Sequence, residues 1–247
     1  DMRDGEFIFN GVNFYENNVY IQERPEIPRA ERNETLVDIP GRFVPLTNWD
    51  GTYLPVEFTL SLFLKAQNAE TAIDEYYQIT SKLQDSVNHL AKFYFDENYY
   101  YSVKFTEITL SYQTNYIEGV PFTAKVTCSP LKNDLSGIYP TVIENGAKIY
   151  RMNSSISQPL IEFSGSGDIT INVNGNEFIF KNLLQGNYGI DSEVREVYQI
   201  IDNAYVSINN KYYSKNAFPV FDLEENTISW SGNVSKVQVT TRWASVI

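Results

Sequence analysis

The chain has 247 residues, 43% of them hydrophobic and 20% charged, and its 19 basic and 31 acidic residues give a formal net charge of −12. This length is enough for one large domain or for two smaller ones, each with its own hydrophobic core. The acidic balance argues against tight binding to nucleic acid or anionic membranes, and we interpret it first as a source of solubility.

Aromatic residues make up 15% of the chain, which favours strands over helices. Residues 24–47 form a charged segment that is broken by prolines and interleaved with apolar residues. Such a segment suits an extended arm that lies on a neighbouring molecule. For any single residue of it, a loop packed on its own domain explains the pattern equally well.

Residues 57–65 alternate between apolar and polar side chains, which predicts a half-buried strand. Its apolar positions are Phe58, Leu60, Leu62 and Leu64. From about residue 69 to residue 92 the apolar spacing changes to three and four, which predicts one amphipathic helix of roughly six turns. His89 falls on the polar face of this helix, where we expect it to be solvated.

Residues 99–109 and 116–127 are the next strand-like stretches. We therefore expect residues 1–134 to form an α+β domain in which the helix covers one face of a sheet. Turn-forming residues gather between residues 129 and 140, and we place the domain boundary there.

Residues 135–247 contain short strands and frequent turns without a helix signal, which predicts a β-sandwich. Asn174-Gly175 lies between two alternating runs and predicts a tight hairpin, because both residues tolerate positive φ. A second hairpin is expected at Ser231-Gly232-Asn233, before a last strand over residues 236–243. The fold class is thus mainly β: an N-terminal α+β domain followed by a β-sandwich.

The residue types in the chain offer little support for a catalytic function. One cysteine and one histidine cannot supply a zinc site, and His89 has no evident nucleophile to activate. Cys128 follows a strand-like run and is expected to be a buried structural thiol. We expect no catalytic residue, no metal and no cofactor. No apolar run approaches the roughly 20 residues that span a bilayer, and the N-terminus lacks the pattern of a secretion signal.

Carboxylates are the only reactive groups in surplus, so paired-carboxylate glycoside hydrolysis is the one enzyme class that the composition permits. The candidates in the second domain are Glu162, Asp168, Asp191 and Glu193. A structural interpretation is better, because Asp168 follows a glycine-rich turn, and Asp191 and Glu193 flank Ser192 as in a loop or cap. The chain is predicted not to be an enzyme.

Non-catalytic sugar binding is the stronger rival, because exposed aromatic side chains on a β-sandwich can stack on a sugar ring. The candidate saccharide or partner contacts are Tyr188, Tyr198, Tyr205 and Trp230. Packing in a core or an interface is the more common role of such large aromatic residues.

A set of short motifs, taken together and in order, resembles the distal tail proteins of siphophages, the hub subunits at the tip of long non-contractile tails. In chain order the motifs are Phe7-Ile8-Phe9-Asn10-Gly11-Val12, Asp38-Ile39-Pro40-Gly41-Arg42, Phe163-Ser164-Gly165-Ser166-Gly167-Asp168, Ile190-Asp191-Ser192-Glu193, Ile228-Ser229-Trp230-Ser231-Gly232 and Thr241-Arg242-Trp243. The similarity covers nearly the whole chain.

The resemblance implies a ring of six copies built by the N-terminal domains, with a galectin-like C-terminal sandwich on the outside. It implies that an N-terminal belt joins adjacent subunits, and the matching positions are Arg32, Leu36, Ile39, Arg42, Phe43 and Trp49. The implied neighbours are the tail-tube protein, the tail-tip or tail-associated lysin protein and a receptor-binding protein, at the distal end of the tail in the virion. An acidic lumen would let DNA pass without adhering.

Two alternatives stay open. A monomeric carbohydrate-binding protein would explain the sandwich, although it has no need for a proline-broken arm and a covering helix. A subunit of a phage-derived bacteriocin or secretion device would build the same ring as a virion protein, and the sequence does not distinguish the two.

Overall fold

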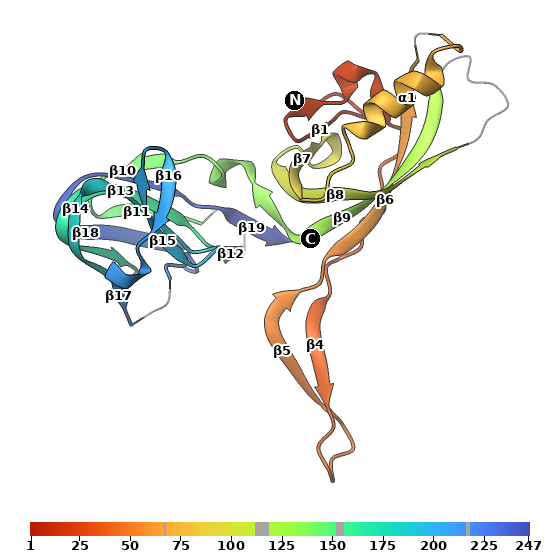
Figure 1. Ribbon diagram of the computed structural model, residues 1–247. Helices are drawn as coiled ribbons and strands as arrows, with labels where there is room; N and C mark the ends of the chain where they lie inside the picture. The colour runs from red at the N-terminus through yellow and green to blue at the C-terminus, as the bar shows by residue number, and fades with distance from the viewer. Residues whose placement is uncertain (67, 112–118, 152–155, 216–217) are drawn as a thin grey trace. The chain divides into compact units, whose positions relative to one another are not determined.

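The computed structural model describes residues 1–66, 68–111, 119–151, 156–215 and 218–247 (Figure 1). Two compact units can be distinguished, one made of Asp1–Lys132 with Val246–Ile247 and the other of Asn133–Ser245. Each unit has its own hydrophobic core, and strands dominate both. The mainly β fold class predicted from the sequence is confirmed.

The first unit is built around one sheet in the order β3-β6-β9-β8-β7-β1-β2. Its strands are β1 (Phe7–Phe9), β2 (Val12–Asn13), β3 (Val19–Ile21), β6 (Val56–Leu64), β7 (His89–Phe93), β8 (Tyr99–Leu110) and β9 (Val120–Asp134). In β6 the four predicted apolar positions are buried and alternate with more exposed ones, which confirms the predicted strand. The start of the next predicted strand at residue 116 lies outside the described residues.

The helix α1 (Ala72–Ser81) packs on this sheet with Ala72, Tyr76 and Ile79 buried. The Tyr76 ring meets the ring of Phe122 on β9 edge-on, with centroids 5.3 Å apart. One apolar stripe therefore attaches the helix to the sheet, as amphipathic spacing requires.

The predicted helix over residues 69–92 is wrong after residue 81. Asp85 Oδ1 accepts a hydrogen bond from the backbone N–H of Ser86 at 2.6 Å, and such local bonds compete with the helical ladder. The chain then enters β7, where the half-buried His89 lies edge-on to Phe9 with ring centroids 5.5 Å apart. His89 therefore belongs to a strand and not to a solvated helix face.

Between β3 and β6 the first unit carries a separate two-stranded sheet, β4 (Arg32–Val37) paired with β5 (Leu46–Tyr53). Figure 1 shows these two strands as a narrow ribbon that ends in a loop. Much of the segment predicted as an extended arm, residues 24–47, is thus one strand and the tip of a β-hairpin. We call residues 31–53 the β4–β5 hairpin.

The second unit has an eight-stranded sheet in the order β10-β18-β13-β14-β15-β16, with β11 also on β18 and β17 also on β14. Its strands are β10 (Thr141–Ile143), β11 (Ala147–Tyr150), β13 (Leu160–Val173), β14 (Asn176–Asp191), β15 (Glu196–Ile201), β16 (Ala204–Ser207), β17 (Tyr212–Ser214) and β18 (Glu225–Thr240). A further pair is formed by β12 (Ile156–Ser157) and β19 (Trp243–Val246). Short 3-10 helices lie at Tyr15–Asn17, Tyr94–Asp96, Leu135–Gly137 and Asn209–Lys211.

The hairpin predicted at Asn174-Gly175 is confirmed. It joins β13 to β14 with Val173 opposite Asn176, and both turn residues have positive φ, 53° and 83°. This is the backbone that a two-residue turn between antiparallel strands requires.

The second predicted hairpin, at Ser231-Gly232-Asn233, is wrong, because β18 runs through these residues without a break. The register of β18 against β13 shifts at this level, and Gly165-Ser166-Gly167 likewise lies inside β13. A Cβ on Gly232 would come within 2.4 Å of the Asp168 carbonyl oxygen, so the close approach needs glycine. The glycines therefore mark β-bulges, which bend strands and raise local twist.

The β-bulges lie within strands that pack on one core. Residues on both sides of the bulges, among them Phe163 and Ile171 on β13, are buried in one shared core. Long strands thus continue through bulges around this core, where the sequence pattern predicted short strands joined by turns.

Candidate functional site

The β4–β5 hairpin is exposed along its length. From residue 31 to residue 53 only Ile39 and Tyr53 are half-buried, and all other residues are exposed. Leu36 is 70% exposed and Phe43 is fully exposed, at 106%, and neither joins a hydrophobic core. Large apolar side chains gathered on one exposed element are typical of an interaction surface.

The base of the hairpin is stabilised by its own side chains. The Arg32 guanidinium lies 4.8 Å from the centre of the Trp49 ring, which is a cation–π contact. The indole N–H of Trp49 donates to the Thr52 carbonyl at 2.7 Å. These contacts give Arg32 and Trp49 a role within the hairpin, whatever else they touch.

The tip of the hairpin contains Ile39-Pro40-Gly41-Arg42. The backbone N–H of Arg42 donates to the Ile39 carbonyl at 3.0 Å, and Gly41 has a φ of 84°. Proline followed by a glycine of positive φ is the pattern of a type II turn. This motif therefore shapes the tip, and it places Phe43 directly after the turn.

The structure brings all six predicted interface residues onto this one hairpin. Arg32 and Trp49 lie at its base, Leu36 on β4, and Ile39, Arg42 and Phe43 at its tip. Their place at a subunit contact stays a prediction. The pairing of residues 46–53 with residues 32–37 was missed, because the alternation there is weak on both strands.

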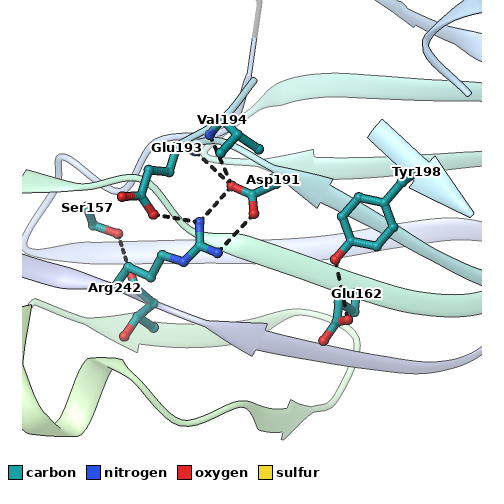
Figure 2. Close-up of polar contacts among 8 residues, drawn as sticks. Ser157, Glu162, Asp191, Glu193, Val194, Tyr198 and Arg242 are labelled. Atoms are coloured by element: carbon teal, nitrogen blue, oxygen red, sulfur yellow. Dashed lines mark hydrogen bonds and ion pairs between the residues drawn. The ribbon is translucent and has the colours of Figure 1, made fainter. Parts of the chain in front are cut away.

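In the second unit, Arg242 binds Asp191 through two parallel hydrogen bonds, from Nη1 to Oδ1 at 2.6 Å and from Nη2 to Oδ2 at 2.9 Å (Figure 2). Nη1 also lies 3.2 Å from Glu193 Oε2. The Asp191 side chain is 12% exposed and that of Arg242 is 24% exposed, so the pair is largely shielded from water. Ser157 Oγ donates to the Thr241 carbonyl beside it.

Burial by itself would raise the pKa of Asp191. The hydrogen bonds and charge of Arg242, with the backbone N–H groups of Val194 and Glu193, outweigh this burial and hold the pKa below its ordinary value. The carboxylate is thus ionised and committed to a structural ion pair. Its bonds to those two N–H groups, at 3.3 Å and 3.0 Å, form the local cap that the sequence predicted.

Asp168, another carboxylate considered for catalysis, binds the backbone, and Cys128 is buried. Asp168 Oδ1 accepts from the backbone N–H of Asn182 at 2.9 Å. Burial raises the pKa of the Cys128 thiol to about 12, so the thiol is protonated at neutral pH. Among the described residues, no group of three or more His, Cys, Asp and Glu side chains could hold a metal ion. Within the same part of the chain, no helix is long and apolar enough to cross a membrane.

The four aromatic residues considered for saccharide binding separate into two groups. Tyr188 is buried against Phe163, with ring centroids 5.5 Å apart, and Trp230 is half-buried against the same core. Tyr198 and Tyr205 come together edge-on at 4.8 Å, and Tyr205 is 71% exposed. The structure thus assigns Tyr188 and Trp230 to packing and leaves Tyr205 accessible.

Tyr198 on β15 pairs with Gly189 on β14, and its ring lies close to this glycine. Its hydroxyl reaches Glu162 Oε1 on β13 at 3.5 Å (Figure 2). A Cβ on Gly189 would meet ring atoms of Tyr198 at 2.3 Å to 2.6 Å, which is closer than any real contact. The glycine is therefore the reason that the Tyr198 ring can lie flat on the sheet.

Replacing Gly189 with alanine is expected to destabilise the second unit by about 1–3 kcal/mol, because the added methyl overpacks the Tyr198 ring. Denaturant unfolding of the single variants and of Gly189→Ala with Tyr198→Ala gives a double-mutant cycle. The methyl should cost little once Tyr198 is alanine. An equal cost in both backgrounds would contradict the contact.

Next to Tyr198, the outward face of the sheet is hollowed. The lining comes from Glu162, Phe163, Ser164, Asn187, Tyr188, Ile200, Lys236 and Gln238. We call this feature the outer hollow. The sequence analysis named Glu162 and Tyr188 but did not bring the lining together, because its residues come from four strands whose order cannot be read from spacing.

No protein-family model and no curated protein matches the chain by sequence. Solved structures do match it. The Dit protein of phage SPP1, described as a paradigm of the hub adsorption apparatus in phages that infect Gram-positive bacteria, is similar with a TM-score of 0.69 and 10% identity, over 95% of this chain and 97% of that chain.

Two structures of the phage P2 baseplate in its activated conformation are also similar. The one with Ca has a TM-score of 0.53 and 9% identity, over 100% of this chain and 99% of that chain. The one with Sr has a TM-score of 0.51 and 9% identity, over 95% of both chains. At these identities the likeness concerns the fold, and it confirms the phage hub and baseplate fold that the sequence motifs predicted. The galectin-like layout of the second unit stays a prediction.

Proposed function

We propose that this chain is a structural subunit of the hub at the distal end of a long, non-contractile phage tail. In this proposal six copies form a ring that links the tail tube to the host-adsorption apparatus. The observation that carries it is the similarity of fold over nearly the whole chain to a phage hub protein and to baseplate proteins.

The β4–β5 hairpin supports a ring. Its exposed Leu36 and Phe43 have no core of their own chain to join, and an element that reaches out from each copy can lie on the next one. Such a contact is heterologous, with different surfaces on the two partners, and it closes into a ring when the rotation between copies is one sixth of a turn.

The proposed partners on the two sides of the ring are the tail-tube protein and the tail-tip or tail-associated lysin protein, with a receptor-binding protein attached nearby. The role is architectural, and catalysis has no part in it. The net charge of −12 fits passage of DNA through the ring, because an acidic lumen repels phosphates.

The first test is the solution mass of the purified protein, measured by light scattering over a concentration series, with negative-stain images of the same samples. A mass close to six times 28.4 kDa and six-fold rings in the images are expected at the high end of the series. A protein that stays monomeric throughout and forms no rings would contradict a self-assembling hub.

A further inference from the structure

The outer hollow of the second unit, about 200 Å³ in volume, has the features of a binding site. It lies on the face of the sheet that points away from the core, where β18, β13, β14 and β15 run side by side. Pockets for drug-sized ligands measure roughly 300–1,000 Å³. The outer hollow is smaller and therefore suits a single small ring.

Strand register explains why the surface is hollowed. Ser164 on β13 pairs with Lys236 on β18 and with Asn187 on β14, and Asn187 pairs with Ile200 on β15. Because successive side chains alternate between faces, these four residues form one outward row. Ser164 is the small residue among longer ones, so the floor of the hollow is the serine and the strand backbone.

Hydrogen bonds hold the walls in place. Ser164 Oγ donates to Asn187 Oδ1 at 2.6 Å, which leaves the amide N–H groups of Asn187 without a partner among the described residues. Gln238 Nε2 donates to Glu162 Oε2 at 2.6 Å, and Gln238 Oε1 keeps no partner in the same part of the chain. The lining of the hollow thus includes one side chain with free donors, Asn187, and one with a free acceptor, Gln238.

The charges favour a neutral ligand. Lys236 and Glu162 both line the hollow, so an anion would meet the carboxylate and a cation would meet the ammonium group. A ligand with several hydroxyl groups can donate to Glu162 and accept from Lys236 and from the Asn187 amide. Such a neutral ligand can form hydrogen bonds with both charged side chains.

An aromatic surface extends the same row. Tyr205 on β16 pairs with Ile200, and its side chain is 71% exposed although it is large and apolar. The Tyr198 ring packs edge-on against the Tyr205 ring, with centroids 4.8 Å apart, and the Tyr198 hydroxyl donates to Glu162. The apolar face of a sugar ring packs well on an aromatic side chain that is held rigid in this way.

We propose that the outer hollow binds one ring of a neutral saccharide, a hexose or an N-acetylhexosamine, with Asn187, Glu162 and Lys236 bonding its hydroxyl groups and Tyr205 stacking beside it. This inference goes beyond the hub role and does not depend on it. A copy in a ring and a single copy carry the same hollow, because all the residues belong to the second unit.

The test is saturation-transfer NMR and titration of the full chain with glucose, galactose, N-acetylglucosamine and N-acetylgalactosamine, with sn-glycerol 3-phosphate as the anionic comparison. Saturable binding of at least one neutral sugar is expected. Ser164→Leu, which fills the hollow, should abolish it, whereas Ser231→Leu on the same sheet should leave it unchanged. Asn187→Ala should weaken it about tenfold.

A second pair of variants tests the aromatic contact. Tyr205→Ala should weaken binding about five- to tenfold, and Tyr213→Ala, which removes another exposed tyrosine of this unit, should not. The proposal is overturned if none of the four sugars binds, if only glycerol 3-phosphate binds, or if Ser164→Leu binds as well as the unaltered chain. Each of these results leaves the solution mass, and so the hub proposal, unaffected.

Discussion

Replacing Leu36 and Phe43 together with aspartate is expected to abolish self-association while leaving each unit folded. Both side chains are exposed in the single chain, at 70% and 106%, so the new carboxylates meet only water there. In a contact between copies they would be buried without a partner, which costs several kcal/mol for each charge. Since every 1.4 kcal/mol is tenfold in affinity, an association that is about a thousandfold or more weaker is expected.

Two measurements on the same samples check this. Light scattering reports the loss of the assembly, and thermal unfolding should shift by no more than about 2 °C, because surface substitutions change stability by about 0.5 kcal/mol or less. The matched control is Tyr77→Asp with Leu184→Asp, which places the same two charges on exposed apolar residues outside the hairpin. An assembly that survives in the hairpin variant would remove the β4–β5 hairpin from the proposed contact.

Leu36 is a better target than Ile39, although both are predicted interface residues. Ile39 is half-buried and its carbonyl accepts the turn bond of Arg42, so a change there also disturbs the tip. Variants of Leu36 and Phe43 therefore test the contact between copies with less effect on folding than a variant of Ile39 would have.

Replacing Arg242 with glutamine is expected to lower the stability of the second unit by about 2–4 kcal/mol at neutral pH, because it leaves Asp191 charged and largely buried without its cation. The contact joins residues 51 positions apart, so its loss affects the folded state and hardly the unfolded chain. Denaturant unfolding at pH 7 measures the effect. Lys148→Gln, which breaks the exposed pair of Lys148 with Glu225, is the control and should change stability little.

The same variant has a predicted dependence on pH. In the unaltered chain the pKa of Asp191 is lower than in the unfolded state, so its contribution is present above the ordinary carboxyl pKa, about 4, and is lost as the pH falls through the lower, folded value. In Arg242→Gln burial dominates and the pKa should rise, so Asp191 takes up a proton more readily. The difference in stability between the two proteins should therefore shrink on acidification, and a constant difference from pH 7 to acid would contradict the assigned role.

Local patterns were sufficient for several features. The alternation over residues 57–65 identified a strand of the first core, and Asn174-Gly175 identified a turn, because each depends only on residues adjacent in the chain. One histidine and one cysteine were enough to argue against a catalytic triad and a zinc site. Short motifs in order were enough to predict the fold that the solved structures share.

Other features were decided only by the tertiary structure, because they depend on which strands lie side by side. Gly232 suits a turn and a bulge equally well, and β18 continues through it because β13 offers hydrogen bonds on both sides of the glycine. The helix ends after Ser81 although its apolar spacing continues, since the Asp85 carboxylate accepts from the Ser86 backbone N–H and the following strand pairs with β8. The Arg242–Asp191 pair and the outer hollow join residues that are distant in sequence, and their partners are set by strand order and register, which the spacing of residues along the chain does not encode.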